Sequence, residues 1–457
     1  MTVPKAEKKN IIIIGGGIIG CTTAYYLTRH PSYDPKLHTI TLIEATRIAG
    51  GASGKAGGLL AIWAYPNNIV PLSFRLHAEL AGEHNGEENW GYRRVTCGDL
   101  EVEGRDWSDQ DLSKGHSLGK RRKGRNEATS GVVRGVPEDL NWILQDQIKG
   151  YEEIGNTDAT AQVHPYLFTT SMIRLAEERG VKVIFGSVTA LSYVSVPGNS
   201  HQMTSPPSEY HHSDPPSPTL SSTSQSSTSS SPSRRKGVNG VVYHDSSNKE
   251  RVLEASHVIL AAGPWTAKLY PSAPISGLRA HSVTITPAEP VSAYALFTKI
   301  TVPPRPRSPL SSPSRSGSRS PMEPVATSAS PEIYARANEI YVCSEGDMEV
   351  ELPATTSEVE VDESRCDELI SQVASISDQI RKGIVTRKQA CYLPIVNIGG
   401  LGPLIGETGV EGLLLASGHS CWGINNAPAT GLIISELVFD GTSKSADIRS
   451  MDPKRVI

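Results

Sequence analysis

Four consecutive isoleucines, Ile11 to Ile14, run directly into the segment Gly15-Gly16-Gly17-Ile18-Ile19-Gly20. The apolar run is strand-sized, and the residues after the glycines are compatible with a helix over 18–30. In such a strand–turn–helix unit, the first glycine permits a tight turn and the third admits a ligand close to the backbone. The last allows the helix to pack on the strand. Because a helix N-terminus favours negative charge, the segment predicts a phosphate-binding βα unit.

The strand expected next along the chain ends in Glu44. A carboxylate at this place is suited to bind the ribose hydroxyls of an adenosine, and it disfavours the 2′-phosphate of NADP. Arg47 follows closely and is a further candidate contact. The segment 50–58 is rich in small residues, so its backbone can lie against an extended ligand, with Ser53 and Lys55 available for polar contacts. The alternative for this segment is a flexible loop without a ligand.

The remaining periodic segments fall at both ends of the chain and in its middle. Helices are expected over 72–88, 139–150, 166–179 and 427–439, and strands over 38–44, 95–103, 181–185, 237–243, 258–262, 282–286 and 412–416. Rossmann-type pieces at both ends with an antiparallel-looking middle predict an α/β fold. The expected architecture is a Rossmann-type nucleotide-binding domain interleaved with an α+β substrate domain that contains an antiparallel sheet.

Three segments differ from the rest in composition. Residues 104–130 are polar, 196–236 are dominated by Ser, Thr and Pro, and 302–331 by Pro, Ser and Arg. Such stretches bury too little apolar area to offset their chain entropy, so we expect disordered surface insertions. Several serines there precede proline, which suggests a kinase or phospho-binding partner, although inert linkers are the alternative. These serines are Ser205, Ser217, Ser231, Ser308, Ser312 and Ser320.

Composition also disfavours several classes of protein. The formal charge is 44 − 48 = −4, which implies no broad basic surface for nucleic acid. The apolar runs are strand-sized, so no transmembrane segment is expected. The six cysteines are scattered without CxxC spacing, which indicates reduced thiols and no metal site. A cytoplasmic setting is the resulting expectation.

The order of motifs resembles the D-amino-acid oxidase, glycine oxidase and sarcosine oxidase family of flavoproteins. The segment Cys-Trp-Gly-Ile-Asn-Asn and the Ser/Pro insertions resemble a fungal branch of oxidoreductases in this family. The matching segments are 15–20, Glu44, 51–55, 180–183 with Val188, Ala261-Ala262-Gly263-Pro264-Trp265 and Gly418-His419-Ser420-Cys421-Trp422-Gly423-Ile424-Asn425-Asn426-Ala427-Pro428-Ala429-Thr430-Gly431. The resemblance implies FAD as cofactor. It also implies that Val188 contacts the adenine, that Ala262 and Gly263 pass the diphosphate, and that the turn 418–425 lies under the flavin. A helix starting at about Ala427 then presents N–H groups to the pyrimidine ring.

The resemblance divides the chain into alternating parts. The FAD-binding parts are 1–103, 131–195, 237–270 and 396–445, the substrate-domain parts are 271–301 and 332–395, and the insertions are 104–130, 196–236 and 302–331. The family therefore implies two domains that each draw on distant segments of the chain.

Two departures from the family concern the substrate. Leu393 stands before Pro394 where an arginine commonly binds a substrate carboxylate, and Cys421 replaces a second arginine in the terminal turn. Arg279 or Arg387 could substitute for them. A carboxylate in a dry pocket needs a cationic partner, so an ordinary amino-acid substrate is in doubt.

Three residues are further candidates near the flavin. Cys391 lies near the position of the cysteine that bonds covalently to the flavin in sarcosine-oxidase relatives, and the alternative is a buried apolar thiol. His281 precedes an alternating strand and is a candidate general base, against the alternative of a hydrogen-bonded structural histidine. Trp422, like His419, is expected to line the pocket and is the second catalytic candidate.

Together these features predict an FAD-dependent oxidoreductase that oxidises an amine or amino-acid-like small molecule by hydride transfer to flavin, with oxygen as acceptor. A flavin dehydrogenase with another acceptor is one alternative. A flavin-fold protein acting as a phosphorylation-regulated interaction module is the other.

Overall fold

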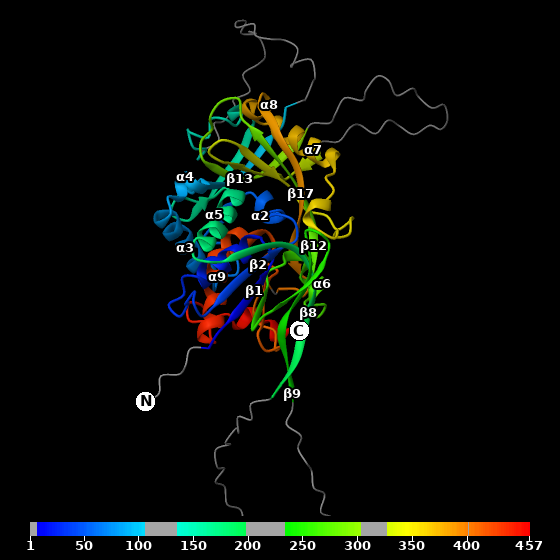
Figure 1. The fold of residues 1–457 in the computed structure, drawn as a ribbon. Helices are drawn as coiled ribbons and strands as arrows, with labels where there is room; N and C mark the ends of the chain where they lie inside the picture. Colours follow the sequence, from blue (N-terminus) through cyan, green and yellow to red (C-terminus); the bar gives the residue numbers. More distant parts are fainter. Residues whose placement is uncertain (1–6, 106–134, 198–233, 303–326, 401) are drawn as a thin grey trace, which may run out of the picture.

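The computed structural model describes residues 7–105, 135–197, 234–302, 327–400 and 402–457. Two large sheets form the molecule, one in each half, and the long strands β12 (Ile275–Thr286) and β17 (Ile384–Val396) run between the halves (Figure 1). The predicted α/β class is confirmed, and the second sheet is antiparallel apart from the parallel pair β5–β13. No helix in the described ranges is long and apolar enough to cross a membrane.

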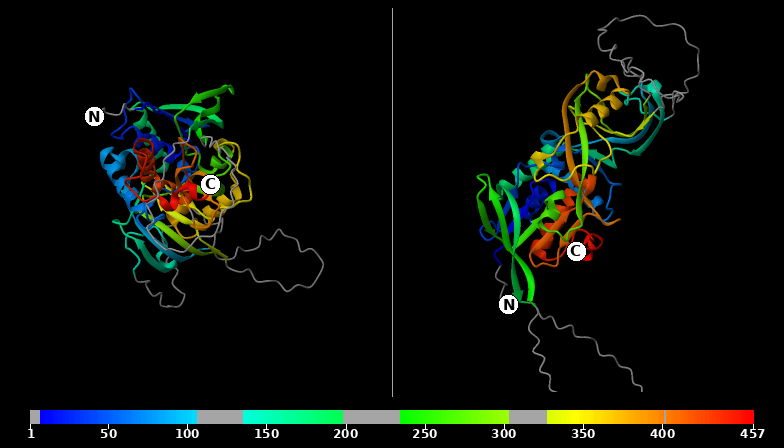
Figure 2. Two further views of the ribbon diagram at one scale, coloured as in Figure 1. Left: turned by 90° about the horizontal axis from the view of Figure 1, so that it is seen from below. Right: turned by 90° about the vertical axis from the view of Figure 1, so that its right-hand side faces the viewer.

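The first sheet has the order β10-β9-β8-β2-β1-β11-β19-β18. Its parallel centre consists of β1 (Asn10–Ile14), β2 (Thr39–Glu44), β8 (Lys182–Pro197), β11 (His257–Leu260) and β19 (Leu413–Ser417). The outer strands are β9 (Arg234–Asp245), β10 (Glu250–Glu254) and β18 (Leu404–Glu407), each paired antiparallel. The β8–β9 hairpin projects from this half of the molecule (Figure 2).

The isoleucines of β1 show why this sheet is buried on both faces. Ile11 and Ile13 pack on one face against the helices α1 (Ile18–Leu27), α3 (Val70–Glu83), α5 (Pro165–Glu177) and α9 (Gly423–Asp440). Ile12 and Ile14 pack on the other face against strand residues that include Leu191 and Val241. Because side chains alternate along a strand, a continuous apolar run is what a strand with two covered faces needs.

The second sheet has the order β17-β12-β16-β15-β13-β5-β6, with β14 (Thr327–Ala329) beside β13. Its remaining strands are β5 (Thr96–Glu103), β6 (Ile148–Gly155), β13 (Tyr294–Val302), β15 (Glu332–Ala335) and β16 (Ile340–Cys343). Its far face packs on α7 (Glu363–Ala374) and α8 (Asp378–Arg381). Its inner face turns toward the first half through a cluster that includes Leu59, Tyr334 and Tyr341. A small third sheet joins β3 (Leu59–Ala61), β7 (Thr160–Gln162) and β4 (Arg93–Arg94).

Several sequence-based boundaries are wrong. The helix expected over 139–150 is a loop followed by a 3-10 turn (Gln145–Gln147) and β6, because Leu140, Trp142 and Ile143 insert into the core under the second sheet. Tertiary hydrogen bonds replace the helical ones there, since the Ser377 hydroxyl donates to the Trp142 carbonyl at 2.6 Å. The helix expected over 72–88 is two helices, α3 and α4 (Gly86–Trp90), with left-handed Asn85 between them.

The expected domain parts also need correction. Strands β5 and β6 were expected within the FAD-binding parts, but they lie in the second sheet, where β5 pairs in parallel with β13. Residues 234–236 and 327–329 were expected in insertions, but they belong to β9 and β14. The rest of the three insertions, and the Ser-Pro positions within them, lie outside the described residues apart from 104–105, 196–197, 302 and 330–331.

Candidate active site

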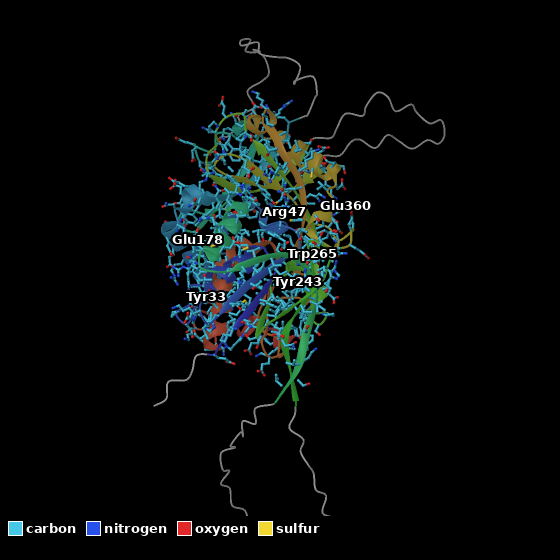
Figure 3. The ribbon with its side chains drawn as sticks, in the orientation of Figure 1. Tyr33, Arg47, Glu178, Tyr243, Trp265 and Glu360 are labelled. Atoms are coloured by element: carbon cyan, nitrogen blue, oxygen red, sulfur yellow. The ribbon has the colours of Figure 1, made fainter. Side chains whose placement is uncertain are left out.

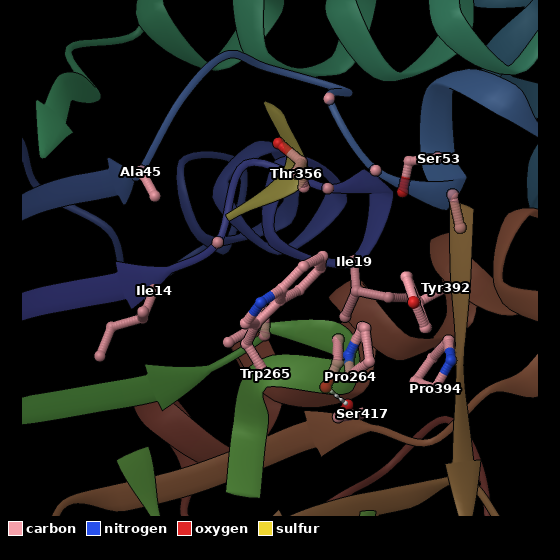
Figure 4. Close-up of a pocket in the computed structure, with 18 of the residues that line it drawn as sticks. Ile14, Ile19, Ala45, Ser53, Pro264, Trp265, Thr356, Tyr392, Pro394 and Ser417 are labelled. Carbon is pink, nitrogen blue, oxygen red and sulfur yellow. Dashed lines mark hydrogen bonds between the residues drawn. The ribbon is translucent and has the colours of Figure 1, made fainter. Parts of the chain in front are cut away.

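The main cavity, of about 420 Å³, lies at the carboxyl ends of β1, β2, β11 and β19. Open α/β sheets bind their ligands at this edge. Figure 4 shows Ile14, Ile19, Ser53, Trp265, Thr356 and Tyr392 around the cavity. Of the predicted site residues, its lining includes Gly15, Gly17, Ile18, Ile19, Glu44, Ser53, Val188, Ala262, Gly263, Trp265, His419, Gly423 and Ile424. Segments far apart in the sequence therefore meet at this cavity.

The glycine turn is packed as its sequence predicts. Gly15 has φ +112°, and a Cβ there would lie 2.4 Å from the carbonyl oxygen of Ala261. A Cβ on Gly20 would lie 2.0 Å from the carbonyl oxygen of Gly15, so helix and turn touch. At Gly17 a Cβ would meet only the Ser53 hydroxyl, at 3.1 Å. Backbone thus borders the main cavity at Gly17, while Gly15 and Gly20 serve packing.

The N-terminus of α1 faces the main cavity without a charged cap. The described residues place no carboxylate in its first turn, and its Ile18 N–H donates to the Ser53 hydroxyl at 2.9 Å. Nearby, the Glu44 carboxylate accepts from the Gly16 N–H at 2.8 Å and from the Thr46 N–H at 2.9 Å. These contacts hold Glu44 at the end of β2, beside the turn. A helix N-terminus and a fixed carboxylate are the elements that bind a diphosphate and an adjoining ribose.

Another wall comes from α9, which packs against α1 and begins at Gly423 and not at Ala427. The prediction placed Pro428 at the start of the helix, where proline is favoured. Pro428 is instead inside α9, where it supplies no N–H to the carbonyl of Ile424. The His77 Nε2 donates to that carbonyl at 2.9 Å and replaces the missing bond. No side chain of the described residues caps α9, so its first-turn N–H groups lie beside the main cavity at Gly423 and Ile424.

His419 provides a test of whether a flavin nucleotide fits. Its Nε2 lies 3.1 Å from the Thr430 hydroxyl, which itself donates to the Asn426 carbonyl at 2.9 Å. The Thr430 oxygen must therefore accept from His419, so the proton is on Nε2. Burial lowers the pKa of His419 to about 3, which keeps the ring neutral. Its buried Nδ1 has no partner among the described residues and is an acceptor beside the main cavity. A flavin nucleotide carries the complementary donors, in its imide N–H and its ribityl hydroxyls.

Other predicted contacts lie behind the lining. The Lys55 Nζ donates to the Ala390 carbonyl at 2.7 Å and ties the small-residue segment to β17. Asn425 accepts from the Ala61 N–H at 3.0 Å. Gly418, at φ +85°, packs against Val396, and Arg47 is exposed (Figure 3). These residues position the walls of the main cavity without lining it.

The catalytic candidates also lie outside the lining. His281 is buried, and its Nε2 accepts from the Asp362 N–H at 3.0 Å, which favours the structural alternative. Trp422 packs edge-on against Trp63, with ring centroids 5.7 Å apart. Cys391 is buried, and burial raises the pKa of its thiol to about 11. That environment favours the apolar thiol over a thiolate poised for flavin attachment.

Sequence reasoning missed one wall. Ala354, Thr355 and Thr356 line the main cavity from the loop between β16 and α7. The Trp265 indole N–H donates to the Pro353 carbonyl at 2.8 Å, and the Thr46 and Thr356 hydroxyls lie 2.5 Å apart. Nothing in a polar Pro/Thr loop signals a ligand, because its position depends on contacts with distant segments. Among the described residues, no group of His, Cys, Asp and Glu side chains could hold a metal ion.

Comparison with known proteins identifies the family. The model of the family described as "FAD dependent oxidoreductase" matches residues 10–206 and 226–437. The chain belongs to this family, and its cofactor is FAD. Two fungal proteins named as oxidoreductases are similar to it. TDA3 of Saccharomyces cerevisiae is 38% identical, covering 98% of this chain and 94% of the relative. C1F5.03c of Schizosaccharomyces pombe is 33% identical, covering 98% and 99%.

Solved structures of a glycine oxidase and an L-proline dehydrogenase share the fold. Glycine oxidase from Geobacillus kaustophilus superposes with a TM-score of 0.62 at 16% identity, covering 99% of this chain and 100% of that one. L-proline dehydrogenase from P. horikoshii gives a TM-score of 0.59 at 15% identity, covering 98% of each chain. At such identities the likeness concerns the fold alone. The predicted family, fold and cofactor are confirmed.

Proposed function

We propose that this FAD-dependent oxidoreductase oxidises the C–N bond of an amine and passes the electrons to oxygen. The observation that supports this proposal is the composition of the main cavity. Its walls combine the glycine turn and the α9 N-terminus with Tyr392, Leu393 and Pro394 of the second sheet. Bound FAD supplies the hydride acceptor. The protein's own contribution is to hold the flavin between the two sheets and to present a substrate to it.

The charges around the main cavity favour an amine over a simple amino acid. Leu393 and Cys421 are in the lining, and Lys268 is the one cationic side chain among the described lining residues. The Lys268 Nζ donates to the Pro353 carbonyl at 2.8 Å, so its hydrogen-bonding capacity is partly used. A substrate carboxylate would therefore enter without a guanidinium partner, at a cost of several kcal/mol.

Arg279 does not supply the missing charge in this structure. It is buried, and its guanidinium lies 3.2 Å from the Asp347 carboxylate. Asp347 also pairs with Arg365 at 3.4 Å, so one carboxylate holds both guanidinium groups. Arg387, the other candidate, is exposed on β17. These positions support a substrate that carries no carboxylate.

A substrate screen tests the proposal. Purified protein reconstituted with FAD is mixed without oxygen with amines that carry no carboxylate and, separately, with glycine, sarcosine and D-alanine, and bleaching of the flavin absorbance is followed. We expect amines to reduce the flavin and the amino acids to react slower by orders of magnitude. Efficient reduction by a free amino acid, lost in Arg279→Ala, would contradict the preference and identify Arg279 as the anchor. Oxygen uptake with a reducing amine separates an oxidase from a dehydrogenase that uses another acceptor.

A further inference from the structure

A second hollow, the side cavity, lies on the second sheet and has a volume of about 450 Å³. Its lining comprises Asp99, Phe297, Thr298, Lys299, Ser330, Glu332, Ser344 and Glu345. Strands β5, β13 and β15 contribute Asp99, Phe297, Thr298, Lys299 and Glu332. The other three residues lie in loops, Ser330 after β14 and Ser344 and Glu345 after β16. Three carboxylates and one ammonium group therefore surround the side cavity.

Glu332 is the partly buried carboxylate of this group. The Tyr334 hydroxyl donates to it, and the Cys343 thiol lies 3.7 Å from its Oε2. Neither neighbour carries positive charge, and no Lys, Arg or His of the described residues forms an ion pair with Glu332. Desolvation raises the pKa of this carboxyl above its ordinary value. When it is ionised, a desolvated carboxylate that has donors but no cation carries a negative charge that no neighbour compensates.

The other charges do not compensate Glu332. The Lys299 Nζ is exposed and lies 3.1 Å from the carboxylate of Glu101, outside the lining. Asp99 and Glu345 are exposed and add negative charge at the rim. The side cavity is therefore negative both at its rim and at its partly buried carboxylate.

Aromatic rings connect the side cavity to the main cavity. Phe297 is the cross-strand neighbour of Glu332, and its ring centroid lies 6.3 Å from that of Trp63. Trp63 in turn packs on Trp422, at 5.7 Å. Trp422 stands between Cys421 and Gly423, which both line the main cavity. Three rings thus lead from the flavin turn to the carboxylate.

We propose that the side cavity binds the positively charged group of an organic amine, with Glu332 as its counter-ion and Phe297 as an aromatic wall. A carboxylate and a ring face are the two groups that bind substituted ammonium ions in proteins. The inference deepens the proposed function, on which it rests for identifying the bound cation as substrate. It explains how an amine is selected in a site whose main cavity offers no guanidinium for a carboxylate.

Binding of a fixed-charge probe tests the side cavity without turnover. Choline and its uncharged isostere 3,3-dimethyl-1-butanol are titrated into the FAD-loaded wild-type protein by calorimetry. We expect choline to bind at least about 10-fold more tightly than the alcohol, which corresponds to about 1.4 kcal/mol. Equal affinities, or no binding of either probe, would overturn the proposal without any variant.

Two matched variants then locate the charge. Glu332→Gln should weaken choline binding about 10-fold or more and leave the alcohol unaffected, whereas Glu345→Gln, on the exposed rim, should change it less than about 3-fold. Equal effects of the two variants would contradict the assignment to Glu332. The flavin spectrum and melting temperature of each variant establish that it folds. If Glu332→Gln does not fold, Phe297→Leu serves as the second variant, and unchanged choline binding there counts against the site.

The pH profile of the wild-type protein gives a further readout. Choline does not titrate, so its affinity should rise with pH as Glu332 loses its proton, and this dependence should be absent in Glu332→Gln. The other titratable groups around Glu332 are Asp99, Glu345 and Lys299 in the lining, and Tyr334, Cys343, Cys97 and Cys421 beside it. Choline binding without oxidation of any amine would support the side cavity while refuting the proposed function. Amine oxidation without choline binding would support the proposed function while refuting the side cavity as a cation site.

Discussion

The main cavity and the side cavity lie on neighbouring sheets, but they are assembled from different kinds of atoms. The main cavity is bordered by backbone, at the glycine turn, at Gly263 and at the first turn of α9. The side cavity is lined by non-glycine residues of the strands β5, β13 and β15 and of the loops after β14 and β16. Backbone walls need glycine at fixed spacing, which leaves a pattern in the sequence. Side-chain walls need only register between strands, which leaves none.

The largest expected effect concerns the backbone wall. Gly17→Val places a branched side chain beside the Ser53 hydroxyl, where the glycine now leaves room for the diphosphate. We expect the variant to lose FAD binding, measured as flavin released on gel filtration and as absorbance. Gly82→Val is the control, because a Cβ on Gly82 meets nothing within 4 Å. A yellow Gly17→Val protein would show that the turn does not need an open backbone.

The next effect concerns how the free energy of unfolding depends on pH through His77, which donates a hydrogen bond to α9. Burial lowers the pKa of His77 to about 4 from the ordinary 6.5. Between these two pH values, His77 is therefore protonated in the unfolded chain and neutral in the folded one. Stability is complete above pH 6.5 and falls as the pH drops toward 4, by about 3 kcal/mol from this residue. Urea unfolding at pH 7, 5.5 and 4.5 measures the slope.

His77→Leu sharpens that measurement. The variant should have a shallower slope, and at pH 7 it should lose about 1–3 kcal/mol, because the carbonyl of Ile424 then has no donor opposite Pro428. Combining it with Pro428→Ala should restore part of the loss by returning a backbone N–H. An unchanged slope in His77→Leu would assign the acid sensitivity to other buried groups.

A smaller effect is expected at His419, the one side chain whose free acceptor we assign to the flavin. His419→Leu removes the Nδ1 acceptor and should raise the Kd for FAD about 5- to 10-fold. His419→Asn keeps an oxygen near the position of Nδ1 and should recover most of the affinity. His38→Leu is the control, since His38 is buried at the amino end of the parallel strands, remote from the main cavity.

Flavin fluorescence quenching on titration with apoprotein gives these constants. N3-methyl-FAD distinguishes the two donors: it binds wild-type protein weakly if the imide N–H donates to His419, and normally if a ribityl hydroxyl does. An unchanged Kd in His419→Leu would show that Nδ1 has no role in binding.

The smallest effect is expected from removing 198–233 and 303–326. β8 and β9 pair to their ends, Pro197 with Arg234, and β13 pairs with β14 from Val302 to Thr327. Short Gly-Ser bridges therefore join strands that already lie side by side. We expect the flavin spectrum to be unchanged and the melting temperature to shift by only a few degrees. Loss of FAD would show that these segments contribute to the site.

The sequence by itself determined the βα unit, the carboxylate at Glu44, the small-residue segment and the terminal turn. These are local rules: a φ of +112° at Gly15 requires glycine, and a Cβ on Gly20 has no room. A resemblance built on such motifs therefore identified the family and the FAD cofactor before any contact was known.

The tertiary structure decided what depends on distant partners. Pro428 lies inside a helix because His77, more than 300 positions earlier, donates to the carbonyl that proline leaves unpaired. His281 is held by the Asp362 backbone, and Arg279 is neutralised by Asp347. Glu332 faces Phe297 only because β13 and β15 pair in that register. Pairing across a sheet and burial of a charge are set by the whole fold, so no local pattern predicts them.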